Sequence, residues 1–139
     1  TDPEGVAQGL DDFFRLLRAS RQDKADFLTP QREAFMRAVA TALAREGIAR
    51  LFFLEVSGVR VASALCFYYN GEVSLYNSGY DPAYSSLSGG LLLKALAIRD
   101  AIELRARAFD FLRGAEPYKY DLGGKDRHLW QITLRPSSA

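Results

Sequence analysis

Two short stretches of this 139-residue chain hold the residue types that could carry out chemistry. The first, residues 80–90, joins tyrosines and serines to the pair Gly89-Gly90 directly ahead of a helical pattern. The second, residues 109–119, is an apolar run that ends in Glu116-Pro117-Tyr118-Lys119. Tyrosine and lysine side chains can supply a proton or positive charge to a reacting atom. The two stretches therefore predict a loop that binds an anion beside a site of proton or group transfer.

The first stretch has the backbone chemistry of a pyrophosphate-binding loop. At the start of a helix several N–H groups lack internal partners and the helix dipole is positive, so an anion is stabilised there. Glycine lets the backbone approach such an anion closely. A second interpretation stays open, in which Ser88 caps the helix and the two glycines form the turn. The residues predicted to bind the anion are Ser86, Leu87, Ser88, Gly89, Gly90 and Leu91.

Two amphipathic helices are predicted ahead of these stretches. Asp2-Pro3 and Thr29-Pro30 are typical helix starts, with a capping oxygen followed by proline in the first turn. Apolar residues follow each start at helical spacing, and Gly47 marks the end of the second helix. The polar residues 21–28 between the two helices are predicted to form a loop.

From residue 51 the apolar pattern changes to that of strands. Strands are predicted over residues 51–56, 59–69 and 72–76, because these runs are rich in aromatic and β-branched residues. Ser57-Gly58 and Asn70-Gly71 separate them, and Asn-Gly is typical of a tight hairpin turn that needs positive φ at both positions. The three strands are therefore expected to form an antiparallel meander.

The second half of the chain alternates between helix and strand. A long helix is predicted over residues 91–108, with Leu91, Leu92 and Ile102 on its apolar face. Short strands are predicted over residues 109–112 and 129–134, the first of them ending in a polar turn. The expected order is two helices, three strands, helix, strand, turn and strand.

This order resembles the N-acetyltransferase fold known as GNAT, and the residues themselves are similar to a narrower group. Residues 79–84, 88–92, 109–114 and 116–119 resemble the acetyltransferase domain of bacterial CelD-like proteins, which are relatives of the Fem peptidyltransferases. The likeness covers nearly the whole chain. It implies an α/β (α+β) fold with a mixed, mostly antiparallel central sheet flanked by helices. It also implies one acyltransferase domain over residues 1–139, the C-terminal half of a longer protein.

The resemblance implies an N-acyltransferase that moves an acetyl or other acyl group from acyl-CoA to an amine by direct attack. The loop of residues 86–91 would then hold the acyl-CoA, which is a co-substrate, and no metal is implied. Lys119 would stabilise an oxyanion or a phosphate, as the matching lysine does in Fem relatives. Tyr118 or Tyr120 would protonate the departing thiolate, and Tyr76 and Tyr80, at the end of the third strand, would line the acceptor pocket. Among these, the catalytic residues predicted are Lys119, Tyr118 and Tyr80.

The loop also departs from the GNAT pattern, and this keeps two other functions open. The superfamily places Arg or Gln, then Gly, then Gly or Ala where this chain has Ser85, Ser88 and Gly90, so only Gly90 fits. A catalytically silent binding module of a polysaccharide-synthesis system is one alternative. A Fem-like transferase that uses aminoacyl-tRNA is the other, although near-neutral charge and the lack of a coiled-coil arm disfavour it.

Composition restricts the partners and the chemistry. The formal net charge of +1 gives no global field for DNA or an acidic membrane, and no apolar run is long enough to span a bilayer. Cys66 and His128 are the only residues of their types, which disfavours a cysteine or histidine metal site. Asp110 is expected either to point into a polar cleft or to pair with Arg113 or a neighbouring lysine, and pairing is favoured over proton abstraction. We expect a cytoplasmic protein acting on a small-molecule or cell-envelope amine, with a missing N-terminal domain or a homodimer completing it.

Overall fold

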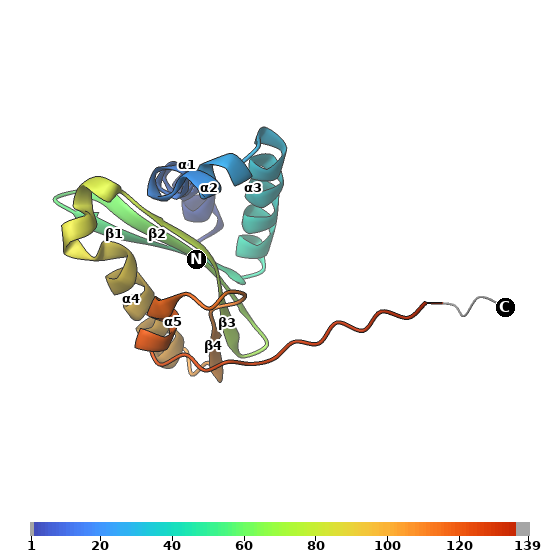
Figure 1. The fold of residues 1–139 in the computed structure, drawn as a ribbon. Helices are drawn as coiled ribbons and strands as arrows, with labels where there is room; N and C mark the ends of the chain where they lie inside the picture. Colours follow the sequence, from blue (N-terminus) through green and yellow to red (C-terminus); the bar gives the residue numbers. More distant parts are fainter. Residues whose placement is uncertain (1, 136–139) are drawn as a thin grey trace.

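A four-stranded sheet with helices on both faces organises the protein (Figure 1). The computed structural model describes residues 2–135. In chain order the elements are α1 (Pro3–Ser20), α2 (Gln22–Phe27), α3 (Pro30–Arg45), β1 (Ala49–Val56), β2 (Val59–Tyr69), β3 (Glu72–Tyr80), the 3₁₀ helix η1 (Pro82–Leu87), α4 (Gly89–Glu103), β4 (Ala108–Asp110) and α5 (Pro117–Asp121). Strands β1, β2 and β3 are antiparallel neighbours, and β4 lies parallel to β3. The mixed, mostly antiparallel sheet confirms the predicted fold class.

Both predicted helix starts are confirmed. The carboxylate of Asp2 accepts a hydrogen bond from the Gly5 N–H at 2.7 Å, and the hydroxyl of Thr29 accepts one from the Arg32 N–H at 3.3 Å. The loop predicted between the first two helices is wrong, because residues Gln22–Phe27 form the short helix α2. This helix buries none of its residues fully, so its sequence lacks the apolar spacing by which helices are recognised.

The hairpin between β2 and β3 forms at the predicted turn. Asn70 and Gly71 have φ of 49° and 75°, as a tight hairpin requires. Strand β3 continues four residues beyond the predicted end at Tyr76 and stops at Tyr80. Asn77, Ser78 and Gly79 are weak strand formers, but they pair with the buried middle of β2. Tertiary pairing thus overrides local propensity and carries Tyr80 to the end of the sheet.

The core lies in two layers, one on each face of the sheet (Figure 1). Alternate residues of β2 supply both layers, with Leu65 facing α1 and Ala64 and Cys66 facing α4. The layer against α1 and α3 comprises Leu10, Phe13, Phe14, Leu17, Leu28, Met36, Ala40 and Leu65. The layer against α4 comprises Ala62, Ala64, Cys66, Val73, Leu75, Leu93 and Ala101. The sheet is therefore covered on both sides, and ligands can reach it only at its ends and edges.

Helix α4 is shorter than predicted and turns a different face to the sheet. It ends at Glu103, and Arg105 then adopts a φ of 57° as the chain reverses into β4. The buried positions are Leu93, Ala97 and Ala101, whereas Ile102 is 69% exposed. A helix that is apolar on most sides does not reveal its buried face, and the two alanines let α4 lie close to the strands. A short helix, α5, replaces the turn predicted around Tyr118.

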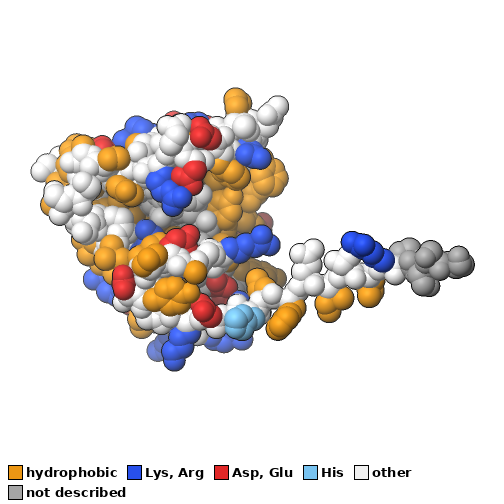
Figure 2. Space-filling model, in the orientation of Figure 1, with side chains coloured by type: hydrophobic (Ala, Val, Ile, Leu, Met, Phe, Trp, Pro, Cys, Tyr) orange, Lys and Arg blue, Asp and Glu red, His pale blue; other side chains and the backbone are white. Residues whose placement is uncertain are grey.

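The strand predicted over residues 129–134 is wrong. Residues 124–135 form no helix or strand; Asp126 and Arg127 still bond to the body of the protein, and the residues after them run away from it (Figures 1 and 2). Leu129, Trp130, Ile132 and Leu134 are at least 78% exposed, and Figure 2 shows hydrophobic side chains along the extended segment. The segment has the composition of a strand. A strand forms only beside a partner, however, and none lies next to this segment among residues 2–135.

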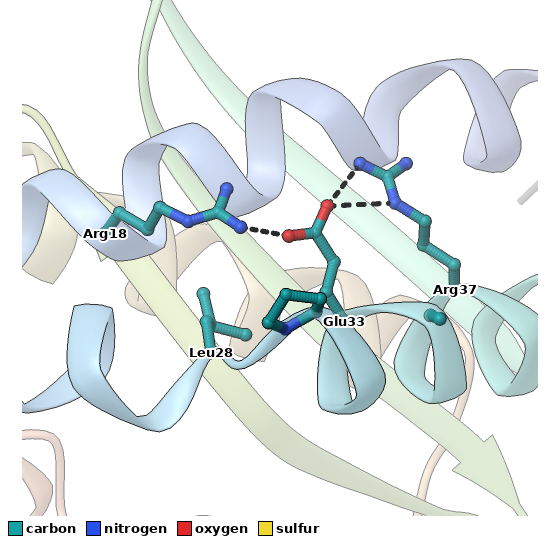
Figure 3. A pocket seen from close by; sticks show the side chains of 6 residues that line it. Arg18, Leu28, Glu33 and Arg37 are labelled. Carbon is teal, nitrogen blue, oxygen red and sulfur yellow. Dashed lines mark hydrogen bonds and ion pairs between the residues drawn. The ribbon is translucent and has the colours of Figure 1, made fainter.

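A cavity of about 330 Å³ lies between α1 and α3, but its charges are already paired (Figure 3). Glu33 accepts hydrogen bonds from Arg18 and, at 2.8 and 3.1 Å, from Arg37. Arg37 also lies 2.7 Å from a carboxylate oxygen of Asp11. Because two arginines face two carboxylates, this arrangement connects the two helices and leaves no excess charge for a ligand. It predicts a pH-dependent contribution to stability.

Replacing Glu33 with Gln is expected to lower the unfolding temperature at pH 7 by a few degrees, corresponding to about 1–2 kcal/mol. Burial alone would raise the pKa of Glu33, but the hydrogen bonds from Arg37 and Arg18 outweigh it and lower that pKa. The stabilising contribution is therefore complete above the pKa of the unfolded chain and is lost as pH falls through the lower folded pKa. Thermal denaturation from pH 7 to pH 3 measures this.

The exposed Glu46, at the end of the same helix, provides the control. Glu46→Gln should leave the unfolding temperature nearly unchanged at every pH. The difference between the wild type and Glu33→Gln should shrink as the solution becomes acidic. A difference that stays constant down to pH 3 would contradict the role given to the Glu33 carboxylate.

Candidate functional site

The open end of the sheet between β3 and β4 sets the position of the candidate site. The two strands pair only from Glu72 to Ser74 on β3 and from Ala108 to Asp110 on β4. Beyond Ser74, strand β3 stays paired with β2 as far as Tyr80 but no longer pairs with β4. Its outer edge there has no neighbouring strand among the described residues. An unpaired edge presents backbone N–H and C=O groups that an extended ligand can bind.

Strand β3 contains a bulge on this unpaired stretch. Leu65 pairs with Asn77 and Cys66 pairs with Leu75, which leaves Tyr76 as the extra residue. The ring of Tyr76 lies 5.6 Å from that of Phe67, centroid to centroid, and does not line the cavity described next. The suggestion from sequence that Tyr76 borders a ligand pocket is thus not supported, and Tyr80 at the strand end takes that place.

A cavity of about 300 Å³ lies where β3 ends and α4 begins. It is lined by Tyr80, Ser85, Ser88, Gly89, Gly90, Leu91, Lys94 and Tyr118. The structure thus brings together four residues of the predicted loop and two of the predicted catalytic residues, although they come from three separate elements. Ser86, Leu87 and Lys119 are not among the lining residues.

The first turn of α4 presents free backbone amides to this cavity. Ser88 has a φ of 48°, and its side chain makes no capping hydrogen bond, so the interpretation of Ser88 as a side-chain cap is wrong. Its carbonyl instead accepts from the N–H groups of Leu91 and Leu92, each at 3.0 Å. Within residues 2–135, the amides of Gly89 and Gly90 have no hydrogen-bond partner. They remain available to an anion at the positive end of the helix.

Lys94 adds a cation that sequence reasoning missed. It lies four residues after Gly90 on the same side of α4, and its Nζ donates to the Gly90 carbonyl at 3.3 Å. The Nζ also lies 4.5 Å from the centre of the Tyr118 ring. Burial lowers the pKa of Lys94, and nearby Glu116 opposes this shift. The sequence signal that could have found Lys94 is its spacing of four residues from Gly90, because this spacing places a basic residue beside the loop on one side of the helix.

Lys119 has a different environment from the one that its predicted role requires. It is 6% exposed, and its Nζ donates to the carbonyls of Arg113 at 2.6 Å and Gly114 at 3.0 Å. It also lies 2.8 Å from a carboxylate oxygen of Glu116, whose pKa is lowered chiefly by the hydrogen bond with Lys119. The ammonium thus connects the loop after β4 to α5. A role in stabilising an oxyanion stays a prediction that this geometry does not support.

The two tyrosines of α5 point to different places. Tyr118 is half-buried and lines the cavity, with its ring packed edge-on against Phe111 at 6.1 Å. Burial raises the pKa of Tyr118, so its hydroxyl keeps its proton at neutral pH. Tyr120 instead donates from its hydroxyl to Asp126 at 2.8 Å and is exposed. Of the two tyrosines, Tyr118 therefore lines the cavity and Tyr120 does not.

Asp110 and Cys66, the other residues considered from sequence, are held in contacts within the fold and do not line the cavity. Asp110 accepts from the Leu112 N–H at 2.7 Å and from Arg127 at 2.9 Å, so the expected pairing with Arg113 is corrected. Cys66 is buried, and burial raises the pKa of its thiol to about 12, which rules out an activated nucleophile.

Among the described residues, no group of three or more metal-ligating side chains comes together. No helix of residues 2–135 is long and apolar enough to cross a bilayer.

Comparison with known families identifies the fold that carries this cavity. The model of the acetyltransferase (GNAT) domain family matches residues 1–120. The chain belongs to this family. The match includes the loop, Lys94 and Tyr118, and so covers all of the residues that line the cavity of the GNAT domain. No curated protein matches the chain in sequence.

Solved acetyltransferases share the fold of this GNAT domain at low sequence identity. The aminoglycoside 6'-N-acetyltransferase AAC(6')-IG from Acinetobacter haemolyticus has a TM-score of 0.63 and 15% identity, over 94% of each chain. The aminoglycoside acetyltransferase meta-AAC0020, from an uncultured soil metagenomic sample and in complex with sisomicin, has a TM-score of 0.59 and 15% identity, over 94% of this chain and 93% of that chain. AAC(6')-Iy, in complex with a bisubstrate analogue containing CoA, has a TM-score of 0.56 and 15% identity, over 73% of this chain and 79% of that chain.

Proposed function

We propose that this GNAT domain transfers an acyl group from acyl-CoA to an amine by direct attack of the amine on the thioester. One observation carries the proposal: the free amides of Gly89 and Gly90 and the ammonium of Lys94 converge on one cavity. Backbone amides, a helix N-terminus and a lysine are together the groups that bind a pyrophosphate. The related fold of AAC(6')-Iy, with its CoA-containing ligand, supports the same assignment.

The open edge of β3 provides the path for the acyl arm of the donor. With its pyrophosphate at the start of α4, the arm would run back along β3 from Tyr80 toward the bulge at Tyr76. The amides of the arm can bond to backbone groups of that edge as an added strand does, apart from those of Ser78, which bond to Lys24 and Asn77. This arrangement exposes the thioester to an amine that enters between β3 and β4.

Tyr118 is proposed to protonate the departing thiolate. In the reaction the amine nitrogen bonds to the thioester carbon, the carbon–sulfur bond breaks, and CoA leaves as a thiolate. The Tyr118 hydroxyl is protonated at neutral pH, as tyrosines ordinarily are, and burial raises its pKa further, so it can donate to that sulfur and regain a proton from solvent. Tyr80 lines the same cavity and is proposed to contact the donor or the amine.

Lys94 favours this function over a catalytically silent module. The loop has Ser85 where the GNAT pattern has a basic or amide side chain, and that loss was the reason to consider a silent domain. The ammonium of Lys94 returns a positive charge to the same cavity from within α4. A Fem-like use of aminoacyl-tRNA is less favoured, because the net charge is only +1.

The finer assignments belong to the same proposal. They are membership of the CelD-like group, a small-molecule or cell-envelope amine as acceptor, a cytoplasmic location, and a second domain or homodimer that completes the site. The resemblance of residues 79–84 and 109–119 supports the first of them.

Replacing Lys94 with Gln is expected to weaken binding of acetyl-CoA about tenfold, since one charge-assisted contact to a phosphate is lost. The variant should also show a weaker dependence of affinity on salt. Isothermal titration calorimetry at two salt concentrations measures both effects. Lys125→Gln is the matched control, because Lys125 is exposed and does not line the cavity. Equal affinity of wild type and Lys94→Gln would remove Lys94 from the proposed donor site.

A further inference from the structure

A second lysine, Lys24 of α2, reaches the open edge of β3. Its Nζ donates to the carbonyl of Ser78, while the Ser78 N–H donates to the side chain of Asn77 at 2.9 Å. The two backbone groups of Ser78 therefore bond to side chains on an edge where β4 no longer pairs. Ser78 lies two residues before Tyr80, which corresponds to roughly 7 Å along a strand. Lys24 thus lies beside the path proposed for the acyl arm.

The surroundings of Lys24 increase the share of its side chain that is a neutral amine. Burial lowers its pKa to about 8, and the cations Lys94 and Arg21 add to this shift, while Asp23 and Glu116 oppose it. Roughly a tenth of such an amine is unprotonated at pH 7. A thioester is attacked only by an unprotonated amine, so Lys24 has the state that acyl transfer requires.

We propose that Lys24 is itself an acyl acceptor, so that the domain transfers the acyl group of its bound donor to Lys24 Nζ. Nζ bonds to the thioester carbon, the carbon–sulfur bond breaks, and the proton lost by nitrogen ends on the CoA thiolate to give the thiol. The product is an amide that keeps one N–H, and this N–H can still donate to the Ser78 carbonyl. The inference rests on the proposed function, because acyl-CoA must first bind.

Other lysines near the site do not combine a position on the open edge of β3 with a pKa lowered to about 8. Lys94 lies at the start of α4 with its Nζ against the Gly90 carbonyl, at the phosphate end of the proposed donor. Lys119 is buried, and its ammonium is held by two carbonyls and Glu116. Lys24 is the lysine that bonds to the open edge of β3. Acylation is therefore expected at Lys24 ahead of both.

The experiment incubates the full chain with acetyl-CoA and follows acetylation by mass spectrometry of the intact protein and its peptides. Lys24 is expected to gain one acetyl group roughly tenfold or more faster than exposed Lys125, because a bound donor raises the effective concentration at Lys24. Lys125 reports the background reaction with free acetyl-CoA. Excess CoA should suppress acetylation of Lys24 and leave that of Lys125 unchanged. Lys24→Arg should lose the modification and still bind CoA in calorimetry.

The outcomes separate this inference from the function on which it rests. If CoA binds but Lys24 is acetylated no faster than Lys125, the acceptor role is overturned while the donor site stands. The same conclusion follows if excess CoA fails to slow acetylation of Lys24. If calorimetry detects no binding of acetyl-CoA or CoA, the proposed function is overturned and the acceptor role with it.

Discussion

Replacing Gly90 with valine is expected to abolish detectable binding of acetyl-CoA, a loss of about 100-fold or more in affinity. A Cβ at Gly90 would lie 3.6 Å from Tyr80 Cδ1 and 3.8 Å from Lys94 Nζ, which are ordinary contacts. The folded protein can therefore accept the new side chain. Its two methyl groups, however, would enter a cavity of about 300 Å³ and block the free amides at the start of α4. Calorimetric titration with acetyl-CoA measures the loss.

The control for Gly90→Val is Ala7→Val, which adds the same branched side chain to an exposed position early in α1. Both variants should retain the circular dichroism spectrum of the wild type, and Ala7→Val should also retain its affinity. Affinity for acetyl-CoA that survives in folded Gly90→Val would refute a donor site at the start of α4. The donor would then have to bind elsewhere on the GNAT domain.

Replacing Gly79 with alanine is expected to destabilise the fold by about 3 kcal/mol or more, at the upper end of the usual cost of overpacking a core. A Cβ there would lie 2.5 Å from the backbone carbon of Leu16 and the backbone nitrogen of Leu17. Backbone atoms of a packed helix cannot move aside as a side chain does, so α1 must shift away from β3. Urea denaturation of the wild type and the variant measures the change.

The neighbouring Ser78→Ala variant is the control for Gly79→Ala. It changes the adjacent residue of β3 without approaching α1, and we expect it to cost at most about 1 kcal/mol. The effect at Gly79 bears on the site, because Tyr80 is the next residue and lines the cavity. A Gly79→Ala protein as stable as Ser78→Ala would show that the close approach of α1 to β3 is not required.

Lys94 and Lys119 show which part of the site could be predicted from sequence. Residues 88–91 were found because a helix start binds anions through its own backbone, which is a local property. Lys94 was missed, since a lysine within a helix is typical of a solvated face. Lys119 was assigned a catalytic role by resemblance, but the structure encloses its ammonium in the loop before α5. The direction in which a side chain points depends on elements that fold against it.

The errors in the fold have a similar origin. Residues 129–134 have a strand pattern but no neighbouring strand, and α2 has a polar sequence but forms a helix whose Lys24 bonds to β3. Asp110 pairs with Arg127, seventeen residues away, instead of the nearby Arg113. Each of these features depends on a contact between segments that are distant in the chain or on the absence of one within residues 2–135.

The sequence by itself determined the features that arise within a few residues: the helix starts at Asp2 and Thr29, the Asn70-Gly71 turn, the meander, and the glycine pair before α4. Capping, positive φ and alternation are local, so each can be predicted from its own residues. The tertiary structure alone decided which side chains meet. It brought Tyr118 beside Lys94 and the loop, and Lys24 to the open edge of β3. These encounters follow from packing between helices and the sheet, and packing depends on the whole chain.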